Sequence, residues 1–291
     1  MTMEHDHHEH SLAQDLAAMM RMASNRRQSL RWLLAGAAVL PVLGCGGGSS
    51  SSDTSTASTT TTTTPSTGTS TTPATGTCGL IPEETGGPYP GDGTNSNSGG
   101  IVNVLTQSGV VRSDIRSSFN GPTGVAAGIL LTIKLQIVNA NNSCASLGGY
   151  TVYLWHCDRD GNYSLYSSSI SAQNYLRGVQ EADSSGNISF TTIFPGCYSG
   201  RMPHVHFEVY PTLAKASNAG NRIKTSQFTF PLATCSEVYA TSGYSASVRN
   251  LAQISFASDN VFSDGTSLQM GTMSGSVTDG YVLTLQVGVS A

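Results

Sequence analysis

Short runs of alternating apolar and polar residues recur through this 291-residue chain, and they constrain its fold more than any other feature. The clearest run, GILLTIKLQIV, covers residues 128–138. Similar or weaker strand signals cover residues 102–105, 109–115, 150–157, 188–194, 204–209, 226–231, 254–257 and 281–289. A period of two is typical of half-buried strands, and clusters of Gly, Asn, Asp and Ser between the runs are typical of turns. The pattern predicts an all-β domain, a β-sandwich of six to nine strands with an Ig-like or prealbumin-like core, and no convincing helix except around 236–240.

The first part of the chain has the pattern of an export signal rather than of a fold. Residues 25–31, NRRQSLR, resemble a twin-arginine signal, and an apolar run at 32–43 is too short to span a bilayer as a stable helix. The run ends in VLGC, which resembles a lipobox with Cys45 as the lipidated residue. We therefore expect residues 1–45 to be a lipoprotein signal segment, with an ordinary signal peptide as the alternative. The protein would be exported, as a cell-envelope lipoprotein or a periplasmic or extracellular protein, with a lipid anchor at Cys45 as its membrane contact.

Residues 46–77 are of low complexity, with a Gly-Ser start followed by threonine runs. They carry almost no charge and no apolar periodicity, so they cannot bury a core, and we expect a disordered tether. Residues 78–291 then form the folded domain. The formal net charge of the chain is −4, which provides no basic surface for nucleic acid.

Five cysteines follow the expected lipidation site, at positions 78, 144, 157, 197 and 235. An oxidising compartment favours disulfides, but an odd number cannot all pair. The simplest expectation is two bridges and one free thiol, with the pairing left open.

The stretch PGCYSGRMPHVHF at 195–207 holds the most chemically distinctive residues of the chain. In a strand, His204 and His206 would share one face, about 6.6 Å apart along the chain, so that both imidazoles could bind one ion. Tyr198 lies six positions upstream of His204, and Tyr163 follows an Asp-Gly turn earlier in the chain. The simpler interpretation is that the two histidines form only the polar face of a strand.

An ordered set of motifs resembles the intradiol ring-cleavage dioxygenases, the relatives of catechol and protocatechuate 3,4-dioxygenases. The motifs, in chain order, are GPY at 87–89, WHCD at 155–158, DGNYS at 160–164, TIFPGCY at 192–198, RMPHVHF at 201–207 and SQF at 226–228. The resemblance runs from about Glu83 to Phe230 and is greatest for the exported, single-chain branch. The chain departs from better-known members in its short connection from Tyr198 to His204 and in lacking their N-terminal helical dimer segment. The pocket geometry and the oligomeric state, including a possible homodimer, therefore stay open.

The resemblance implies one non-haem ferric ion per chain, with Tyr163, Tyr198, His204 and His206 as its ligands. The chemistry is consistent with this set, because a hard Lewis acid favours phenolate oxygens and imidazoles suit iron generally. A solvent hydroxide would complete the site and leave an exchangeable position.

The implied activity is cleavage of a catechol-type ring between its two hydroxylated carbons with dioxygen, giving a cis,cis-muconate-type product. Tyr198 would leave the metal and accept a substrate proton. Arg201 would contact the substrate and stabilise the carbanion-like ring, with a surface salt bridge as the simpler interpretation. Gln227 would lie beside the iron, or else be a plain strand amide, and Tyr89 would line the pocket. No nicotinamide or flavin fingerprint is present.

Two other kinds of protein are compatible with the same residues. One is a noncatalytic β-sandwich binding module on a lipoprotein stalk, for instance for carbohydrate, and the other is a zinc or copper enzyme that uses the two histidines. His156 is expected to be a structural strand residue rather than a ligand. Protocatechuate, catechol, hydroxyquinol and chlorinated or lignin-derived catechols all remain open as substrates.

Overall fold

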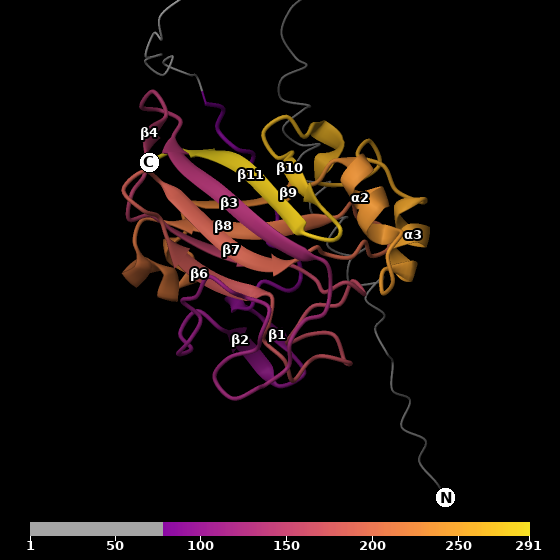
Figure 1. Cartoon of the computed structure of the whole chain (residues 1–291). Coiled ribbons are helices and arrows are strands. Elements are labelled where there is room, and N and C mark those ends of the chain that lie inside the picture. Colours follow the sequence, from indigo (N-terminus) through magenta and orange to yellow (C-terminus); the bar gives the residue numbers. More distant parts are fainter. Residues whose placement is uncertain (1–77) are drawn as a thin grey trace, which may run out of the picture. The chain divides into compact units, whose positions relative to one another are not determined.

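The computed structural model describes residues 78–291, which form a mostly-β fold with two short α-helices beside it (Figure 1). The expected signal segment 1–45, with its lipidation site Cys45, and the expected tether 46–77 lie outside the described residues. Within the described residues no helix is both long and apolar enough to cross a membrane.

The elements follow one another in this order: β1 (Asp92–Asn97), β2 (Gly100–Asn103), β3 (Leu130–Asn139), β4 (Ala145–Ser146), β5 (Thr151–Trp155), β6 (Arg177–Glu181), β7 (Asn187–Ile193), β8 (His204–Tyr210), the 3-10 turns η1 (Leu213–Ser217) and η2 (Ala219–Asn221), β9 (Lys224–Thr229), α2 (Leu232–Tyr239), α3 (Ser245–Leu251), η3 (Phe262–Asp264), β10 (Thr272–Ser276) and β11 (Gly280–Val289).

Two larger sheets and one small one contain all of these strands. β3 is the central strand of the five-stranded sheet, in which it pairs in parallel with β11 and antiparallel with β7 and β4, while β10 pairs with β11. The four-stranded sheet has the antiparallel order β6-β5-β8-β9. β1 and β2 form a separate hairpin.

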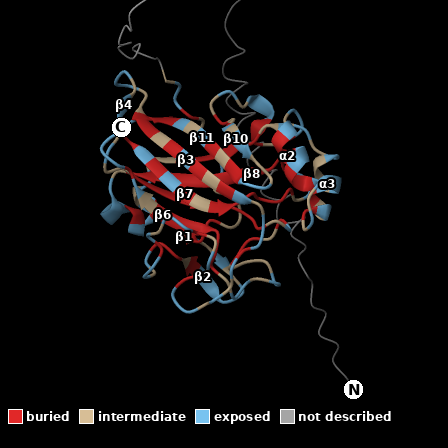
Figure 2. Cartoon of the chain, viewed as in Figure 1, coloured by how far each residue is buried: buried red, intermediate tan, exposed pale blue. Residues whose placement is uncertain are grey.

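The two larger sheets share one hydrophobic core. Along β3 the buried positions Leu131, Ile133, Leu135 and Ile137 alternate with accessible ones, which is visible as alternating colours in Figure 2. The same core takes up Val205, Phe207 and Val209 of β8, together with side chains of β5, β7, β9 and β11. The all-β prediction is therefore confirmed in part, since the fold is mostly β with two short helices, and its core lies between two sheets as in a sandwich.

The four-stranded sheet is buried on both faces, unlike the five-stranded sheet. All seven residues of β8 are buried, including the charged and polar ones. A second apolar cluster lies on the side of this sheet that faces away from the core, and it includes Tyr153 and Trp155 of β5 and Tyr163 of the following loop. A strand covered on both sides can hold polar side chains in a site closed to bulk water.

Several details differ from the sequence expectations. Residues 109–115 make only isolated bridges, and 254–257 form a turn instead of a strand. β1, β6 and β10 were missed because they contain Gly, Asn, Ser and charged residues without clear alternation. α3 was missed as well, since a helix of seven residues is too short to show a helical period.

The cysteine expectation was wrong in its count. The described residues contain one disulfide, between Cys78 and Cys144, and three free thiols at Cys157, Cys197 and Cys235. Each free thiol is buried in an apolar cluster, with Cys157 in the outer one and the other two in the central core. Counting cysteines cannot foresee this, because burial as a small apolar side chain competes with pairing.

Candidate metal centre

β8 carries the two histidines on the face that points away from the central core. Its odd-numbered residues enter the core, so His204 and His206 lie on the opposite face. The ring of His206 stacks on Trp155 of the neighbouring strand, with centroids 5.1 Å apart and an angle of 5° between the planes. Nδ1 of His204 lies 2.6 Å from the backbone carbonyl of Met202, a contact in which the ring donates and Nε2 keeps a free lone pair.

Tyr163 comes from the loop between β5 and β6. Asp158 begins this loop and accepts hydrogen bonds from the backbone N–H groups of Asp160 and Asn162, at 3.0 and 2.9 Å. Gly161 has φ of +87°, which favours glycine, and the chain then turns Tyr163 inward until it is only 2 % exposed. The DGNY motif thus builds a turn that directs the phenol toward β8.

Tyr198 lies on the turn that precedes β8, and α3 holds this turn from behind. The N–H of Cys197 donates to Oγ of Ser247 at 2.9 Å, and the Asn250 side chain donates to the Cys197 carbonyl at 2.7 Å. A Cβ atom on Gly161 would lie 2.9 Å from Cβ of Tyr198, so glycine is required for the two loops to approach. Tyr198 keeps part of its surface exposed.

The structure brings all four residues together. Nε2 of His204 lies 3.1 Å from Nε2 of His206, 3.1 Å from Oη of Tyr198 and 3.4 Å from Oη of Tyr163. Ligands that bind one first-row metal ion at about 2.0–2.2 Å lie about 3 Å from each other, so this spacing suits donors around one ion. The two phenols and the two imidazoles thus converge from separate segments of the chain, and their role as metal ligands stays a prediction.

Burial sets the protonation of these groups when no metal is bound. It raises the pKa of Tyr198 to about 12 and that of Tyr163 well above its usual value. Burial is the largest cause that lowers the pKa of His204, and the positive charge of Arg201 is the second. Burial is also the largest cause that lowers the pKa of His206, with the charge of His204 as the second. The four groups are thus neutral near pH 7, and the imidazoles are already in the form that binds metals.

The donor set is chemically compatible with a hard trivalent ion. The described residues contain no cluster of three or more His, Cys, Asp or Glu side chains that could hold a metal, so any ion here would depend on the tyrosines. Two phenolates would offset two of the three positive charges of a ferric ion, and the two imidazoles would add no charge. Phenolate oxygens are hard donors and imidazole nitrogens are borderline ones, a combination that suits ferric iron.

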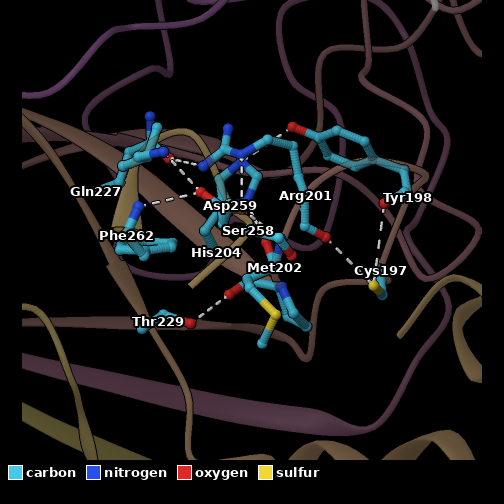
Figure 3. Close-up of polar contacts among 12 residues, drawn as sticks. Cys197, Tyr198, Arg201, Met202, His204, Gln227, Thr229, Ser258, Asp259 and Phe262 are labelled. Carbon is cyan, nitrogen blue, oxygen red and sulfur yellow. Dashed lines mark hydrogen bonds and ion pairs between the residues drawn. The ribbon is translucent and has the colours of Figure 1, made fainter. Parts of the chain in front are cut away.

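Arg201 and Gln227 lie next to this set and are joined to each other. Arg201 is 3 % exposed and donates from Nη2 to Oε1 of Gln227 at 2.7 Å (Figure 3). It also pairs with the buried carboxylate of Asp259, with Nε 3.0 Å from Oδ2. Burial alone would lower the pKa of Arg201, but Tyr198 and Asp259 raise it above its usual value, so the side chain stays cationic. The alternative of an exposed surface salt bridge for Arg201 is therefore wrong.

The segment at 80–91 that precedes β1, here called the N-terminal arm, closes another side of the site. The ring of Tyr89 packs against the ring of Tyr163 with centroids 5.1 Å apart. A Cβ atom on Gly87 would lie 3.2 Å from the His206 ring, so the arm passes close to the face of β8 that carries the two histidines. Gln227 donates to the carbonyl of Thr85 at 2.8 Å and ties the arm to β9.

Two further residues, Arg177 and Asp259, hold the site together, and both lie outside every motif of the resemblance. Arg177 is completely buried, and its acceptors belong to Tyr89, Pro90, Tyr153 and Ser164. No local pattern marks either residue, because their partners lie far away in the sequence.

His156 is confirmed as a structural residue. Nδ1 lies 2.7 Å from the Cys157 carbonyl and Nε2 lies 2.7 Å from Oγ1 of Thr192. Both ring nitrogens are thus engaged, and neither is available to a metal.

Comparison with known proteins gives a family match. A family model described as "Dioxygenase" matches residues 111–218, a range that includes Tyr163, Tyr198, Arg201, His204 and His206. No curated protein is similar enough to count as a match.

Solved structures with the same fold are dioxygenases. An intradiol ring-cleavage dioxygenase from Tetranychus urticae superposes with a TM-score of 0.56 at 24% identity, covering 73% of this chain and 95% of that one. A second structure, titled a dioxygenase, gives a TM-score of 0.53 at 24% identity, covering 73% of this chain and 94% of the other. At this identity the likeness establishes the fold alone. Together with the family match over residues 111–218, it shows that this chain resembles the intradiol ring-cleavage dioxygenases, as its motifs predict.

Proposed function

We propose that this protein is a non-haem ferric dioxygenase that cleaves a catechol-type ring between its two hydroxylated carbons. The observation that carries this proposal is the meeting of two phenol oxygens and the His206 imidazole within 3.1–3.4 Å of a second imidazole nitrogen, Nε2 of His204. A binding module would need no such convergence of ionisable donors in a buried place.

Tyr163, Tyr198, His204 and His206 would hold one ferric ion per chain. The ion would supply Lewis acidity that keeps the phenolates ionised and allows a catechol to bind as its anion. The carbonyl of Met202 and the ring of Trp155 would keep the two imidazoles in fixed orientations.

Tyr198 would be the ligand that moves. It retains exposed surface, whereas Tyr163, His204 and His206 are each about 2 % exposed. Substrate would thus approach on the Tyr198 side, and its phenolate oxygen would accept the proton of an incoming catechol hydroxyl. The raised pKa of Tyr198, about 12, would make its phenolate a competent base.

Arg201 would act on the substrate ring. As a buried cation it would stabilise negative charge that develops on a ring carbon when the catecholate reacts with dioxygen, and a preorganised charge is most effective where water is excluded. Gln227 would hold the guanidinium in place through the bond at 2.7 Å. Tyr89, packed on Tyr163, would form a wall of the substrate site.

Oxygen uptake across a panel of catechols tests the activity. We expect at least one catechol to consume one dioxygen per ring and to give a muconate-type diacid whose mass includes both atoms of isotopically labelled dioxygen. Arg201→Met should lower the rate by about 10²-fold or more if the cation stabilises the reacting ring. Iron-loaded protein that consumes no oxygen with any catechol of the panel would refute the proposal.

We also propose that the domain is exported and tethered to a membrane through Cys45. The Cys78–Cys144 disulfide supports an oxidising compartment, since such bonds rarely persist in the cytosol. The intact mass of the protein from a membrane fraction should include a diacylglyceryl group at Cys45, and an unmodified mature chain would contradict the anchor.

A further inference from the structure

Asp259 is a fully buried carboxylate in the C-terminal segment between α3 and β10. It lies in the turn before η3 and is 0 % exposed. The position is outside residues 111–218, the range of the family match, and outside all motifs that carry the resemblance. A buried charge of this kind is costly unless it is fully paired and hydrogen-bonded.

Both carboxylate oxygens of Asp259 are occupied, but by different parts of the chain. Oδ1 accepts hydrogen bonds from the backbone N–H groups of Val261 and Phe262, at 2.8 and 3.1 Å. Oδ2 accepts from Nε of Arg201 at 3.0 Å and from the N–H of Met202 at 2.7 Å. Oδ1 of Asp259 is thus held by the backbone of its own segment. Oδ2 holds the turn that leads into β8, through Arg201 and Met202.

Arg201 is held from two directions as a result. Asp259 binds its Nε, and Gln227 accepts from its Nη2 at 2.7 Å, while Phe262 lies with its ring centroid 5.9 Å from Cζ of Arg201 (Figure 3). Gln227 is itself anchored to the carbonyl of Thr85. A long arginine side chain would otherwise sample several rotamers, and this arrangement leaves its planar fork one orientation.

The same carboxylate supports the backbone next to His204. The N–H of Met202 donates to Asp259, and the carbonyl of Met202 is the partner of Nδ1 of His204 at 2.6 Å. Asp259 therefore anchors both the guanidinium of Arg201 and the Met202 peptide group that orients the imidazole of His204.

We propose that Asp259 is the positioning residue for Arg201 in the proposed ring-cleavage reaction. It neutralises the buried guanidinium and holds its Nε in place. The inference rests on the proposed function, and it assigns a role to the C-terminal segment that neither the family match nor the motifs include.

A double-mutant cycle with Arg201 tests this role in the iron-loaded full chain. Asp259→Asn keeps the size of the side chain but replaces the acceptor that faces Arg201. We expect it to lower kcat/KM by about 10²-fold, mainly through kcat, since a small misplacement of a reacting group has an effect of this order. Iron content should stay near that of the wild type.

The decisive comparison is the same substitution in the Arg201→Met background. If Asp259 acts through Arg201, adding Asp259→Asn there should change kcat/KM by less than about threefold, because the two effects are not additive. Asp264→Asn, an exposed carboxylate in η3 of the same segment, serves as the matched control and should leave kcat/KM within about twofold.

Several outcomes would overturn the inference. One is an equal loss from Asp259→Asn in the wild-type and Arg201→Met backgrounds, and another is a lowered Tm with unchanged kcat/KM. Either result would make Asp259 a purely structural residue while the wild type still cleaves catechols. Should Asp259→Asn fail to fold, Asp259→Glu keeps the charge but moves the carboxylate, and the same cycle applies to it. A wild type without activity would refute the proposed function, and this inference with it.

Discussion

The guanidinium of Arg177 donates a hydrogen bond to the backbone carbonyl of Tyr89 at 2.9 Å, although the two residues lie 88 positions apart. The same side chain donates to the carbonyls of Pro90 and Ser164, at 2.8 and 3.0 Å. It thus joins the N-terminal arm to the loop that carries Tyr163. Tyr89, the expected wall of the candidate site, and the loop of the candidate ligand Tyr163 are thus held by the same buried side chain.

Replacing this anchor should damage both stability and substrate binding. Arg177→Met removes the donors and leaves buried carbonyls unpaired, which should lower the free energy of unfolding by about 3 kcal/mol or more, as several buried hydrogen bonds are lost. The KM for a catechol should rise because Tyr89 loses its fixed position. Urea unfolding and steady-state kinetics measure the two effects.

Arg116→Met is the control for the loss of an arginine. Arg116 pairs with Asp114 at 2.7 Å on the surface, where both side chains are at least 40 % exposed. Its replacement should change stability by less than about 1 kcal/mol. Equal effects of the two substitutions would contradict the anchoring role of Arg177.

Gly161→Ala tests how closely the two tyrosine loops must approach. The added Cβ would lie 2.9 Å from Cβ of Tyr198, and the backbone has φ of +87°. We expect a loss of stability of about 1–2 kcal/mol from the backbone conformation, together with a fall in kcat because Tyr198 is displaced. Gly149→Ala is matched in φ, at +81°, with nothing within 4 Å of its Cβ. It should lower stability similarly and leave kcat unchanged; a fall in kcat for both variants would contradict the displacement of Tyr198.

The cysteine pattern predicts a specific result from thiol labelling. Alkylation of the unfolded, unreduced domain should modify Cys157, Cys197 and Cys235 and spare Cys78 and Cys144, as peptide mapping by mass spectrometry can show. Cys144→Ser opens a loop of 66 residues and should lower stability by about 2–4 kcal/mol. A second protected pair among the three buried thiols would contradict the structure.

Stability should fall in mild acid, and His156 should contribute to the fall. Burial lowers the pKa of His156 to about 4, while in the unfolded chain it titrates near 6.5. Between these values the unfolded state binds more protons, so the stability due to the neutral ring is complete above about pH 6.5 and is lost as the pH falls toward 4. The full effect is about 3 kcal/mol.

His156→Gln should flatten this pH dependence. Glutamine does not titrate, so the free energy of unfolding of the variant should change less between pH about 6.5 and 4 than that of the wild type. Urea unfolding at several pH values measures the slope. Identical slopes for the two proteins would show that His156 does not titrate differently on unfolding.

The mostly-β fold could be predicted because local patterns encode it, whereas the four candidate ligands were implied by the resemblance of the motifs to a known family. Alternation of apolar and polar residues predicted β3 and β8, and an Asp-Gly turn was expected before Tyr163. The arrangement that fixes the site could not be predicted in the same way. Arg177 and Asp259 act through partners tens of residues away, and nothing in their sequence neighbourhoods distinguishes them from surface charges.

Metal analysis combined with a visible spectrum decides the claim that Tyr163, Tyr198, His204 and His206 bind one ferric ion. We predict about one iron per chain and a burgundy colour from tyrosinate-to-iron charge transfer in the wild type. Tyr163→Phe and His206→Ala should abolish the colour or shift it strongly, while Tyr281→Phe, whose hydroxyl bonds Glu237 away from β8, should leave it unchanged. A wild-type protein that stays colourless and free of iron after loading with ferrous salt in air would contradict the claim.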